Sequence, residues 1–398
     1  MPKNLVVCCD GTANEFADDR TNVAKLCYCL IKDADRQVVY YHPGVGTEAP
    51  PGFVTGFGTK LAKLAGLAFG YGLKRDVANA YIFIIDNYKP GDRLFIFGFS
   101  RGAYTARVVA ALIHMYGVIM PGNDALVPYM VKMLWAINKA RGNNDKISRY
   151  FKLASDFKAT LSGNECKPHF VGVWDTVSSV GWFGSPVSLP YTRDNPDIQI
   201  TRHAVSIDER RAFFRTNLFA VPEGRDIKQI WFAGVHCDVG GGYKEEESGL
   251  SKISLKWMIE DAEESELLLD PKLKSNILGG DEPRFAKPGT TSKMHESLTW
   301  KWWPAEFVPK RYYDRRSNSE TWRIGLSRRR YLGERPVVHD SVWRIPNYRF
   351  LPTDALRASN AFPQNSVNDR DRVMPAAMIS TTQEVKLNAD DAKKSVMS

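Results

Sequence analysis

Ser100 is the residue whose setting in the chain most directly suggests chemistry. It lies in LFIFGFSRGAYTAR, residues 94–107, where an apolar run ends in Gly-x-Ser-x-Gly and a helical pattern begins. A strand that turns into a helix through this motif is typical of a nucleophile elbow, whose tight turn presents the serine hydroxyl at the edge of the sheet. Gly98 and Gly102 avoid collisions that side chains would make with the neighbouring strand or helix. The motif is short, so a chance match in a strand-to-helix turn is the alternative.

A serine nucleophile needs a histidine to accept its proton and an acid to orient that histidine. In α/β hydrolases the chain order is Ser, then Asp or Glu, then His. Asp175 in VGVWDTVSSVG and His236 in IWFAGVHCDVGGGY each end an apolar run downstream of Ser100. We therefore predict that Ser100, His236 and Asp175 form a catalytic triad.

Each predicted partner also has a plain structural interpretation. Asp175 precedes a threonine and could cap a turn, and His236 could be a buried structural histidine, with Asp238 capping the next turn of the chain. His339, in PVVHDSVWRI, is the one serious rival, because it too lies downstream of Ser100 and beside an acid. No suitable strand-end position is predicted for the histidines His42, His114, His169 and His203.

Acyl transfer also requires donors for the developing oxyanion. The backbone N–H of Arg101, the residue after the nucleophile, is one predicted donor. The loop CDGTAN after the first strand is expected to supply the second, from the N–H of Gly11 or Thr12, with Asp10 ordering the loop. Asp238 is predicted to order the loop after His236. A simple turn after the first strand is the alternative, since backbone roles leave little trace in a sequence.

Other enzyme classes find less support. Aspartyl phosphotransferases use Asp-x-Asp-Gly-Thr, but the position two residues before Asp10 is Cys8, so the nucleophile would be missing. The chain has no Walker lysine pattern and no His-Glu-x-x-His. Asp10 and Asp238 could share a divalent ion, although carboxylates at strand ends are weak evidence for one. We predict neither a metal nor another cofactor.

The apolar runs that would position these residues alternate with helical patterns. The predicted strands span residues 4–11, 37–44, 92–100, 169–177 and 229–240, and the predicted helices 21–31, 73–88, 103–115, 124–141 and 252–264. Runs that are apolar on both faces are typical of parallel strands covered by helices. We therefore predict an α/β-hydrolase-like, doubly wound, mostly parallel sheet, with the carboxyl ends of its strands along one edge, where ligands bind.

The pattern changes twice along the chain. Residues 44–72 are glycine-rich and apolar, which suits either a cover beside a pocket or a packed connection. From about residue 282 the chain is rich in Trp, Arg and Pro and only weakly periodic. We predict a catalytic domain over 1–281, an irregular extension packed on it over 282–374 and a flexible tail over 375–398.

Composition places the 398 residues among globular enzymes, with 43% hydrophobic residues and 25% charged residues. The net charge of +9 favours contact with anionic surfaces or simply solubility. The 6 cysteines have neither disulfide-framework nor zinc-site spacing. With no predicted signal peptide or membrane-spanning run, a cytoplasmic location is expected by default and leaderless export stays open. The basic residues that could meet anionic head groups, or form an ordinary solvated surface, are Lys60, Lys63, Arg315, Arg316 and 328–330.

Several longer motifs resemble one known family. CDGTANEF, TNV, YYHPGVGT, the run from AFGYGLKRD to FSRGAYTAR, VGVWDTVSSVG, RHAVSIDERRAFF and WFAGVHCDVGGGY, all within residues 4–245, are similar to the α/β-hydrolase family known as domain of unknown function 2235, with a weaker likeness at 338–344. That family includes phospholipase effectors of bacterial type VI secretion. The resemblance assigns the catalytic roles to Ser100, Asp175 and His236 and implies cleavage of glycerophospholipid esters.

The sequence as a whole predicts a serine hydrolase of carboxylic esters, with lipid or phospholipid acyl esters as substrates, that works through an acyl-enzyme. Residues 44–72 and 126–137 could line an acyl pocket or form a lid, and the second segment could equally be a packed core helix. The alternative is a catalytically idle hydrolase fold that binds membranes or other anionic surfaces. Nucleic acid is not an expected partner, because no known nucleic-acid-binding motif is present.

Overall fold

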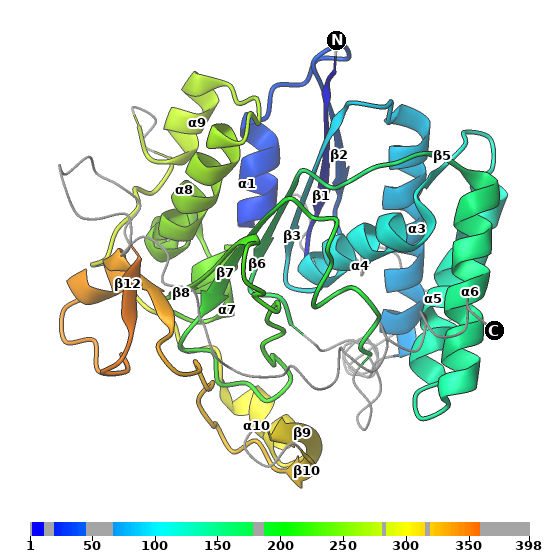
Figure 1. Ribbon diagram of the computed structural model, residues 1–398. Coiled ribbons are helices and arrows are strands. Elements are labelled where there is room, and N and C mark those ends of the chain that lie inside the picture. The colour runs from blue at the N-terminus through cyan, green and yellow to red at the C-terminus, as the bar shows by residue number, and fades with distance from the viewer. Residues whose placement is uncertain are drawn as a thin grey trace, which may run out of the picture.

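The computed structural model describes residues 2–11, 20–44, 67–177, 187–280, 284–314 and 319–358 (Figure 1). Thr12, most of the glycine-rich segment 44–72, Arg315, Arg316 and the predicted tail 375–398 lie outside the described residues. Predictions that fall on those residues, including Lys60 and Lys63, stay predictions.

An eight-stranded sheet forms the centre of the molecule, in the order β12-β11-β8-β7-β6-β3-β1-β2. All of its strand pairings are parallel. The strands are β1 (Asn4–Cys9), β2 (Gln37–His42), β3 (Arg93–Phe99), β6 (Phe170–Trp174), β7 (Ile200–Ser206), β8 (Asp226–Phe232), β11 (Val337–His339) and β12 (Leu356–Ala358). Because the strands are parallel, their carboxyl ends lie along one edge. The fold is thus the predicted α/β-hydrolase-like sheet.

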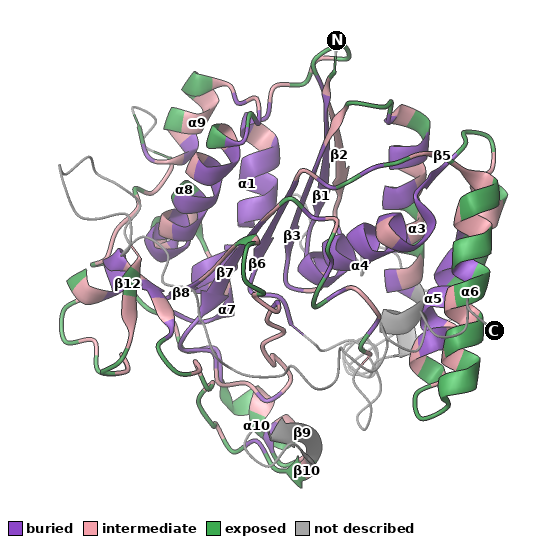
Figure 2. Cartoon of the chain, in the orientation of Figure 1, coloured by how far each residue is buried: buried purple, intermediate pink, exposed green. Residues whose placement is uncertain are grey.

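Helices cover both faces of this sheet, and the period of two along each strand explains why. Val6 and Cys8 of β1 pack into one core cluster, while Leu5 and Val7 pack into the other. One face is covered by α1 (Asn22–Cys29), α8 (Gly249–Glu264) and α9 (Pro271–Ile277), and the other by α3 (Leu67–Asn87), α4 (Arg101–Tyr116), α5 (Val127–Lys139) and α6 (Asn144–Leu161) (Figure 1). The buried residues therefore concentrate along the sheet and the inner sides of the helices (Figure 2). Buried residues of α5 belong to this core, including Met130, Val131 and Leu134.

Strand β7 and helix α6 were not predicted from the sequence, for different physical reasons. β7 reads ITRHAVS, in which Arg202 and His203 interrupt the apolar run, but both are buried with partners. Arg202 pairs with Asp226 and Asp261, and His203 contacts Gln229. α6 is a charged helix whose only fully buried residue is Ala154, so its apolar signal is weak.

The region from residue 284 onward both extends the sheet and projects from it. Strands β11 and β12 continue the sheet beside β8. Earlier in this region lie η3 (Trp300–Trp302), α10 (Trp303–Glu306) and a hairpin of β9 (Lys310–Asp314) and β10 (Ser319–Arg323), at the lower end of Figure 1. Short elements elsewhere are β4 (Val118–Ile119), β5 (Ser162–Asn164), α7 (His236–Gly240), η1 (Asp124–Leu126), η2 (Glu245–Glu247) and η4 (Asp340–Arg344). Among the described helices, none combines the length and apolar character needed to cross a bilayer.

Candidate active site

Ser100 occupies a strained turn between β3 and α4. Its φ of 59° and ψ of −116° lie in a region that residues other than glycine rarely adopt. A Cβ on Gly98 would come within 2.4 Å of the carbonyl oxygen of Gly102, and one on Gly102 within 2.1 Å of that of Cys9. Both glycines are therefore needed for the elbow to close. This geometry holds the serine side chain at the carboxyl edge of the sheet.

Three separate strand ends bring the predicted triad residues into contact. Asp175 directly follows β6, and His236 follows β8 as the first residue of α7. The Oγ of Ser100 lies 2.8 Å from Nε2 of His236, and Nδ1 of His236 lies 2.5 Å from Oδ2 of Asp175. All three side chains are buried. An Nδ1–H donated to Asp175 leaves Nε2 free to accept the serine proton.

Two aromatic rings enclose the imidazole of His236. The ring centroid of Phe99 lies 4.6 Å from it and that of Phe214 lies 4.8 Å from it. Burial lowers the pKa of His236 below 6.5, and Arg211 acts in the same direction, whereas Asp175 and Glu209 act to raise it. These surroundings therefore favour the neutral imidazole, which is the form that a general base requires.

Asp175 is held ionised by its neighbours. Burial acts to raise the pKa of this carboxyl, but Arg330 and His236 together hold it well below its usual range. The backbone N–H of Ser206 also donates to Oδ1 of Asp175, at 3.0 Å. The φ of Asp175, 37°, shows that the turn after β6 is itself strained. The carboxylate is therefore both charged and fixed in orientation.

The loop after β1 lies against the serine. A Cβ built on Gly11 would lie 3.6 Å from Cβ of Ser100. Asp10 orders this loop by accepting hydrogen bonds from Thr21 Oγ1 at 2.6 Å and Tyr41 Oη at 2.7 Å. The N–H of Gly11 donates to Oδ1 of Asp10 at 2.6 Å, so its assignment as an oxyanion donor stays a prediction. Arg101 opens α4 directly after Ser100.

Asp238 orders the start of α7, the helix that carries His236. Its Oδ2 accepts from the N–H of Val235 at 3.0 Å and from the N–H of His295 at 3.1 Å. Its Oδ1 lies 2.7 Å from Nδ1 of His295, whose Nε2 lies 3.0 Å from Glu247. The carboxylates of Asp10 and Asp238 are thus engaged by separate donors. Within the described part of the chain, no group of three or more His, Cys, Asp or Glu residues could hold a metal ion.

The other histidines have partners of their own. His339 stacks on Phe232 and its Nδ1 lies 2.8 Å from Ser341 Oγ. His114 pairs with Asp197, and His169 contacts Gln199 at the start of its strand. His42 ends β2 and lies 3.3 Å from Asp76. Among the described residues, His339 contacts Phe232 and Ser341 and not Ser100, so nothing there supports the rival role considered for it.

A large part of the chain matches a known protein family. Residues 3–261 match the family described as "T6SS, Phospholipase effector Tle1-like, catalytic domain". The chain belongs to this family. Membership agrees with the resemblance found in the sequence motifs.

Individual relatives of this Tle1-like chain match it over only part of their lengths. The uncharacterized protein YEL023C of Saccharomyces cerevisiae is 35% identical over 231 residues, which cover 54% of this chain and 33% of the yeast protein. A solved structure of an uncharacterized protein from Pseudomonas aeruginosa has a TM-score of 0.41 and 19% identity, over 69% of this chain and 48% of that one. The Tle1 effector solved with the VgrG spike of the type 6 secretion system has a TM-score of 0.36 and 17% identity, over 63% and 52%. The matches thus span only a third to about half of these relatives' lengths.

Arg330, Glu209 and Phe214 line the site but were not predicted as part of it. Arg330 belongs to the basic run 328–330, for which head-group contact was considered, but its side chain is buried against Asp175. Glu209 and Phe214 lie in SIDERRAFF, which carries part of the family resemblance without indicating a role for either residue. The sequence of a charged or aromatic run does not indicate which residues elsewhere in the chain its side chains will contact. Only the fold reveals which members face inward.

Proposed function

We propose that this Tle1-like protein is a serine hydrolase that cleaves carboxylic esters through an acyl-enzyme. The observation that carries the proposal is the continuous chain of contacts from Ser100 Oγ through the His236 ring to the Asp175 carboxylate. A serine hydroxyl is a weak nucleophile until a base accepts its proton. In this arrangement a neutral, correctly oriented base lies within hydrogen-bond distance.

The first half of the reaction forms the acyl-enzyme. Ser100 Oγ bonds to the ester carbonyl carbon while its proton passes to Nε2 of His236, and the carbonyl π electrons move to oxygen. The tetrahedral intermediate then collapses, the bond to the alkoxy group breaks, and the imidazolium returns the proton to the leaving alcohol. Asp175 remains ionised throughout and stabilises the imidazolium.

The second half repeats these steps with water as the nucleophile. His236 accepts a proton from water as the hydroxyl oxygen bonds to the acyl carbon, and collapse releases the carboxylic acid and restores Ser100. The N–H of Arg101, at the positive end of the α4 dipole, is proposed as one oxyanion donor. The loop containing Gly11 and Thr12 is proposed as the source of the second.

We further propose that the esters are those of phospholipids. The family description supports this class of substrate, and so does a set of exposed apolar side chains in the region after residue 284. This set, called here the apolar face, consists of Trp300, Trp303, Phe307, Trp322, Ile324 and Leu326, all exposed. Its segments are tied together because the N–H of Gly325 donates to the carbonyl oxygen of Glu306, at 3.1 Å. Tryptophan side chains favour the interface between lipid and water.

Basic residues accompany the apolar face. Lys301, Arg323 and Arg328 are exposed and lie within or beside it in the chain. Cations beside apolar side chains suit a surface that carries anionic lipid head groups. We therefore propose peripheral contact with an anionic bilayer.

The proposal is tested by labelling and by lipid analysis. A fluorophosphonate probe should label the wild-type protein and the control Ser148→Ala, whose serine is exposed on α6, but not Ser100→Ala. Mass spectrometry of phospholipid vesicles should show free fatty acid and lysophospholipid with the wild type and this control, but not with Ser100→Ala. A folded wild-type protein that neither labels nor cleaves any short acyl ester would instead support the idle binding module.

A further inference from the structure

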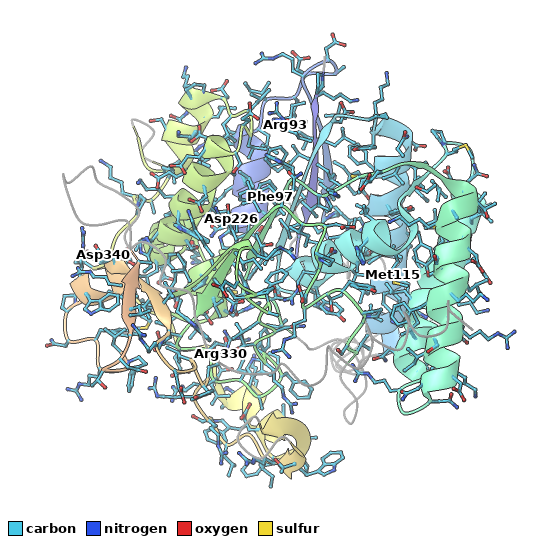
Figure 3. The ribbon with its side chains drawn as sticks, viewed as in Figure 1. Arg93, Phe97, Met115, Asp226, Arg330 and Asp340 are labelled. Carbon is cyan, nitrogen blue, oxygen red and sulfur yellow. The ribbon has the colours of Figure 1, made fainter. Side chains whose placement is uncertain are left out.

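We propose that Arg330 is a positioning residue of this active site, which holds the carboxylate of Asp175 in place. Arg330 lies outside the region that matches the family, and with it the site has four members instead of three. The inference rests on the proposed serine hydrolase function. Arg330 lies far beyond residue 261, where the family match ends. In Figure 3 it lies toward the lower, carboxyl end of the sheet, beyond Phe97 along the direction in which β3 runs from Arg93.

The guanidinium of Arg330 donates hydrogen bonds to both carboxylate oxygens of Asp175. Nη1 lies 2.5 Å from Oδ1, and Nη2 lies 3.1 Å from Oδ2. His236 Nδ1 contacts the same Oδ2, at 2.5 Å. A two-point contact of this kind fixes the plane of the carboxylate as well as its position. The direction in which Oδ2 faces the imidazole is therefore set by the arginine.

The same guanidinium also ties down two neighbouring backbone segments. Nη1 donates to Ser206 Oγ at 2.7 Å and to the carbonyl oxygen of Ser206 at 3.0 Å, at the end of β7. Nη2 donates to the carbonyl oxygen of Phe214 at 2.6 Å. Phe214 packs its ring on the imidazole of His236. Arg330 thus fixes both the acid that orients the histidine and the wall that contacts its ring.

The charges explain why a cation is useful at this point. Asp175 is fully buried, and only 7% of the Arg330 side chain is exposed. A buried carboxylate without a counter-charge is costly, whereas this pair is neutral while His236 is neutral. When the serine proton moves to His236, the new imidazolium is balanced by the developing oxyanion. Arg330 also donates to Oδ2 of Asp175, the oxygen that accepts from His236 Nδ1–H, and its positive charge therefore limits the basicity of His236.

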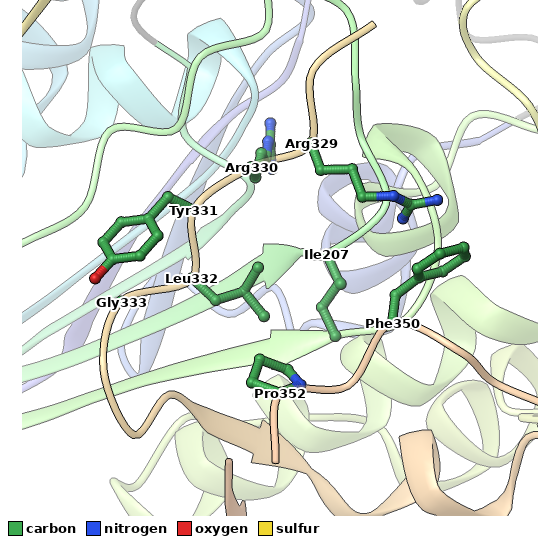
Figure 4. A pocket seen from close by; sticks show the side chains of 8 residues that line it. All are labelled: Ile207, Arg329, Arg330, Tyr331, Leu332, Gly333, Phe350 and Pro352. Carbon is green, nitrogen blue, oxygen red and sulfur yellow. The ribbon is translucent and has the colours of Figure 1, made fainter. Parts of the chain in front are cut away.

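The neighbouring residue provides a matched control. Arg329 faces the other way, with its guanidinium 3.2 Å from the ring centroid of Phe350 and 3.6 Å from Asp208. Both arginines border an open pocket of about 310 Å³ whose apolar lining includes Ile207, Leu332 and Pro352. Figure 4 shows the Arg330 side chain directed away from this pocket and Arg329 directed toward Phe350. Adjacent substitutions thus separate loss of the clamp from loss of surface charge.

The first experiment compares Arg330→Ala, Arg330→Lys and Arg329→Ala on a soluble short-chain ester. Arg330→Ala should lower kcat by about 10²-fold with little change in KM, because the defect is one of geometry at the base. Arg330→Lys should recover only part of kcat, since an ammonium cannot make the two-point contact. Arg329→Ala should retain wild-type kcat. Equal losses in Arg330→Ala and Arg329→Ala would overturn the proposal.

A second experiment guards against the possibility that Arg330→Ala merely folds poorly. Guanidinium or ethylguanidinium ions at concentrations below denaturation should restore part of the kcat of Arg330→Ala and leave Arg329→Ala unchanged. The acid limb of kcat should also move to higher pH in Arg330→Ala, because a cation that restrains His236 basicity has been removed. The charged groups that face His236 and remain are Asp175, Glu209 and Arg211. No rescue together with an unmoved acid limb would leave only a structural role, and the proposal would fail.

These outcomes are separable from failure of the proposed function itself. If wild type is not labelled by the fluorophosphonate and hydrolyses no ester, the serine hydrolase function fails. If wild type is active and Arg330→Ala matches it in kcat and acid limb, only the positioning role fails. The downfield proton resonance of an imidazole N–H held by a carboxylate, present in wild type and lost or moved in Arg330→Ala, gives a readout independent of turnover.

Discussion

Glu209 supports the first turn of the helix that carries His236: its Oε2 accepts a hydrogen bond from the backbone N–H of His236 at 3.3 Å. The same carboxylate binds the guanidinium of Arg211 at 2.8 and 2.9 Å and accepts from Ser297 Oγ at 3.0 Å. Because Arg211 in turn packs over the ring of Phe214, one buried acid links the backbone of the histidine to the wall of its pocket.

Glu209 should make stability depend on pH. Burial acts to raise the pKa of Glu209, but Arg211, with smaller contributions from Arg330 and His236, lowers that pKa from 4.5 to about 2. A lowered folded-state pKa contributes stability above pH 4.5 that is lost as the pH falls from 4.5 toward 2, roughly 3 kcal/mol in all. In urea unfolding, the free energy of unfolding of Glu209→Gln should be well below that of the wild type at pH 7, and the difference should be smaller at pH 3. A difference in unfolding free energy that does not change with pH would contradict the proposed ionisation of Glu209.

The acid limb of kcat/KM reports the pKa of His236. Since burial lowers this pKa and only the neutral imidazole acts as a base, activity should persist below the pH at which a free imidazole becomes protonated. We expect the midpoint of the acid limb below 6.5. Rates on a soluble ester, measured across pH with folded protein at each point, check the expectation. A midpoint above 6.5 would show that Asp175 and Glu209 outweigh burial.

Gly102 and Gly11 should respond differently to the same substitution. In Gly102→Ala the new Cβ would lie 2.1 Å from a backbone oxygen, so the elbow must shift, at a cost of about 3 kcal/mol or more. In Gly11→Ala the nearest atom is at 3.4 Å, an ordinary contact. Thermal unfolding should therefore show a large loss for Gly102→Ala and a small one for Gly11→Ala. Equal losses would mean that the elbow relaxes more easily than its contacts imply.

The apolar face should matter for bilayers and not for soluble esters. The double variant Trp303→Ser, Phe307→Ser should keep wild-type turnover of a short soluble ester and bind anionic vesicles about tenfold or more weakly, since each buried aromatic side chain contributes on the order of 2 kcal/mol. Vesicle co-sedimentation at low and high salt measures this. The control is Tyr129→Ser, Leu153→Ser, which removes exposed apolar side chains from α5 and α6. Equally weakened vesicle binding in both double variants would indicate nonspecific hydrophobic adsorption instead of binding through the apolar face.

Much of the site could be predicted because parallel strands place their carboxyl ends together. Ser100, Asp175 and His236 each end an apolar run, and the order of the three residue types agrees with a known topology. The polar strand β7 could not be found in this way, since the side-chain partners of Arg202 and His203 lie far away in the chain.

The sequence by itself determined the parallel sheet, the glycine-framed turn at Ser100 and the candidate acid and base, because these depend on local residue types and periodicity. Tertiary structure alone decided that Arg330, one of three consecutive arginines, faces inward to Asp175, while Arg329 stacks on Phe350. The physical reason is that burying a charge is costly, and a partner of opposite charge beside it offsets that cost. Here that partner lies 155 residues away in the chain.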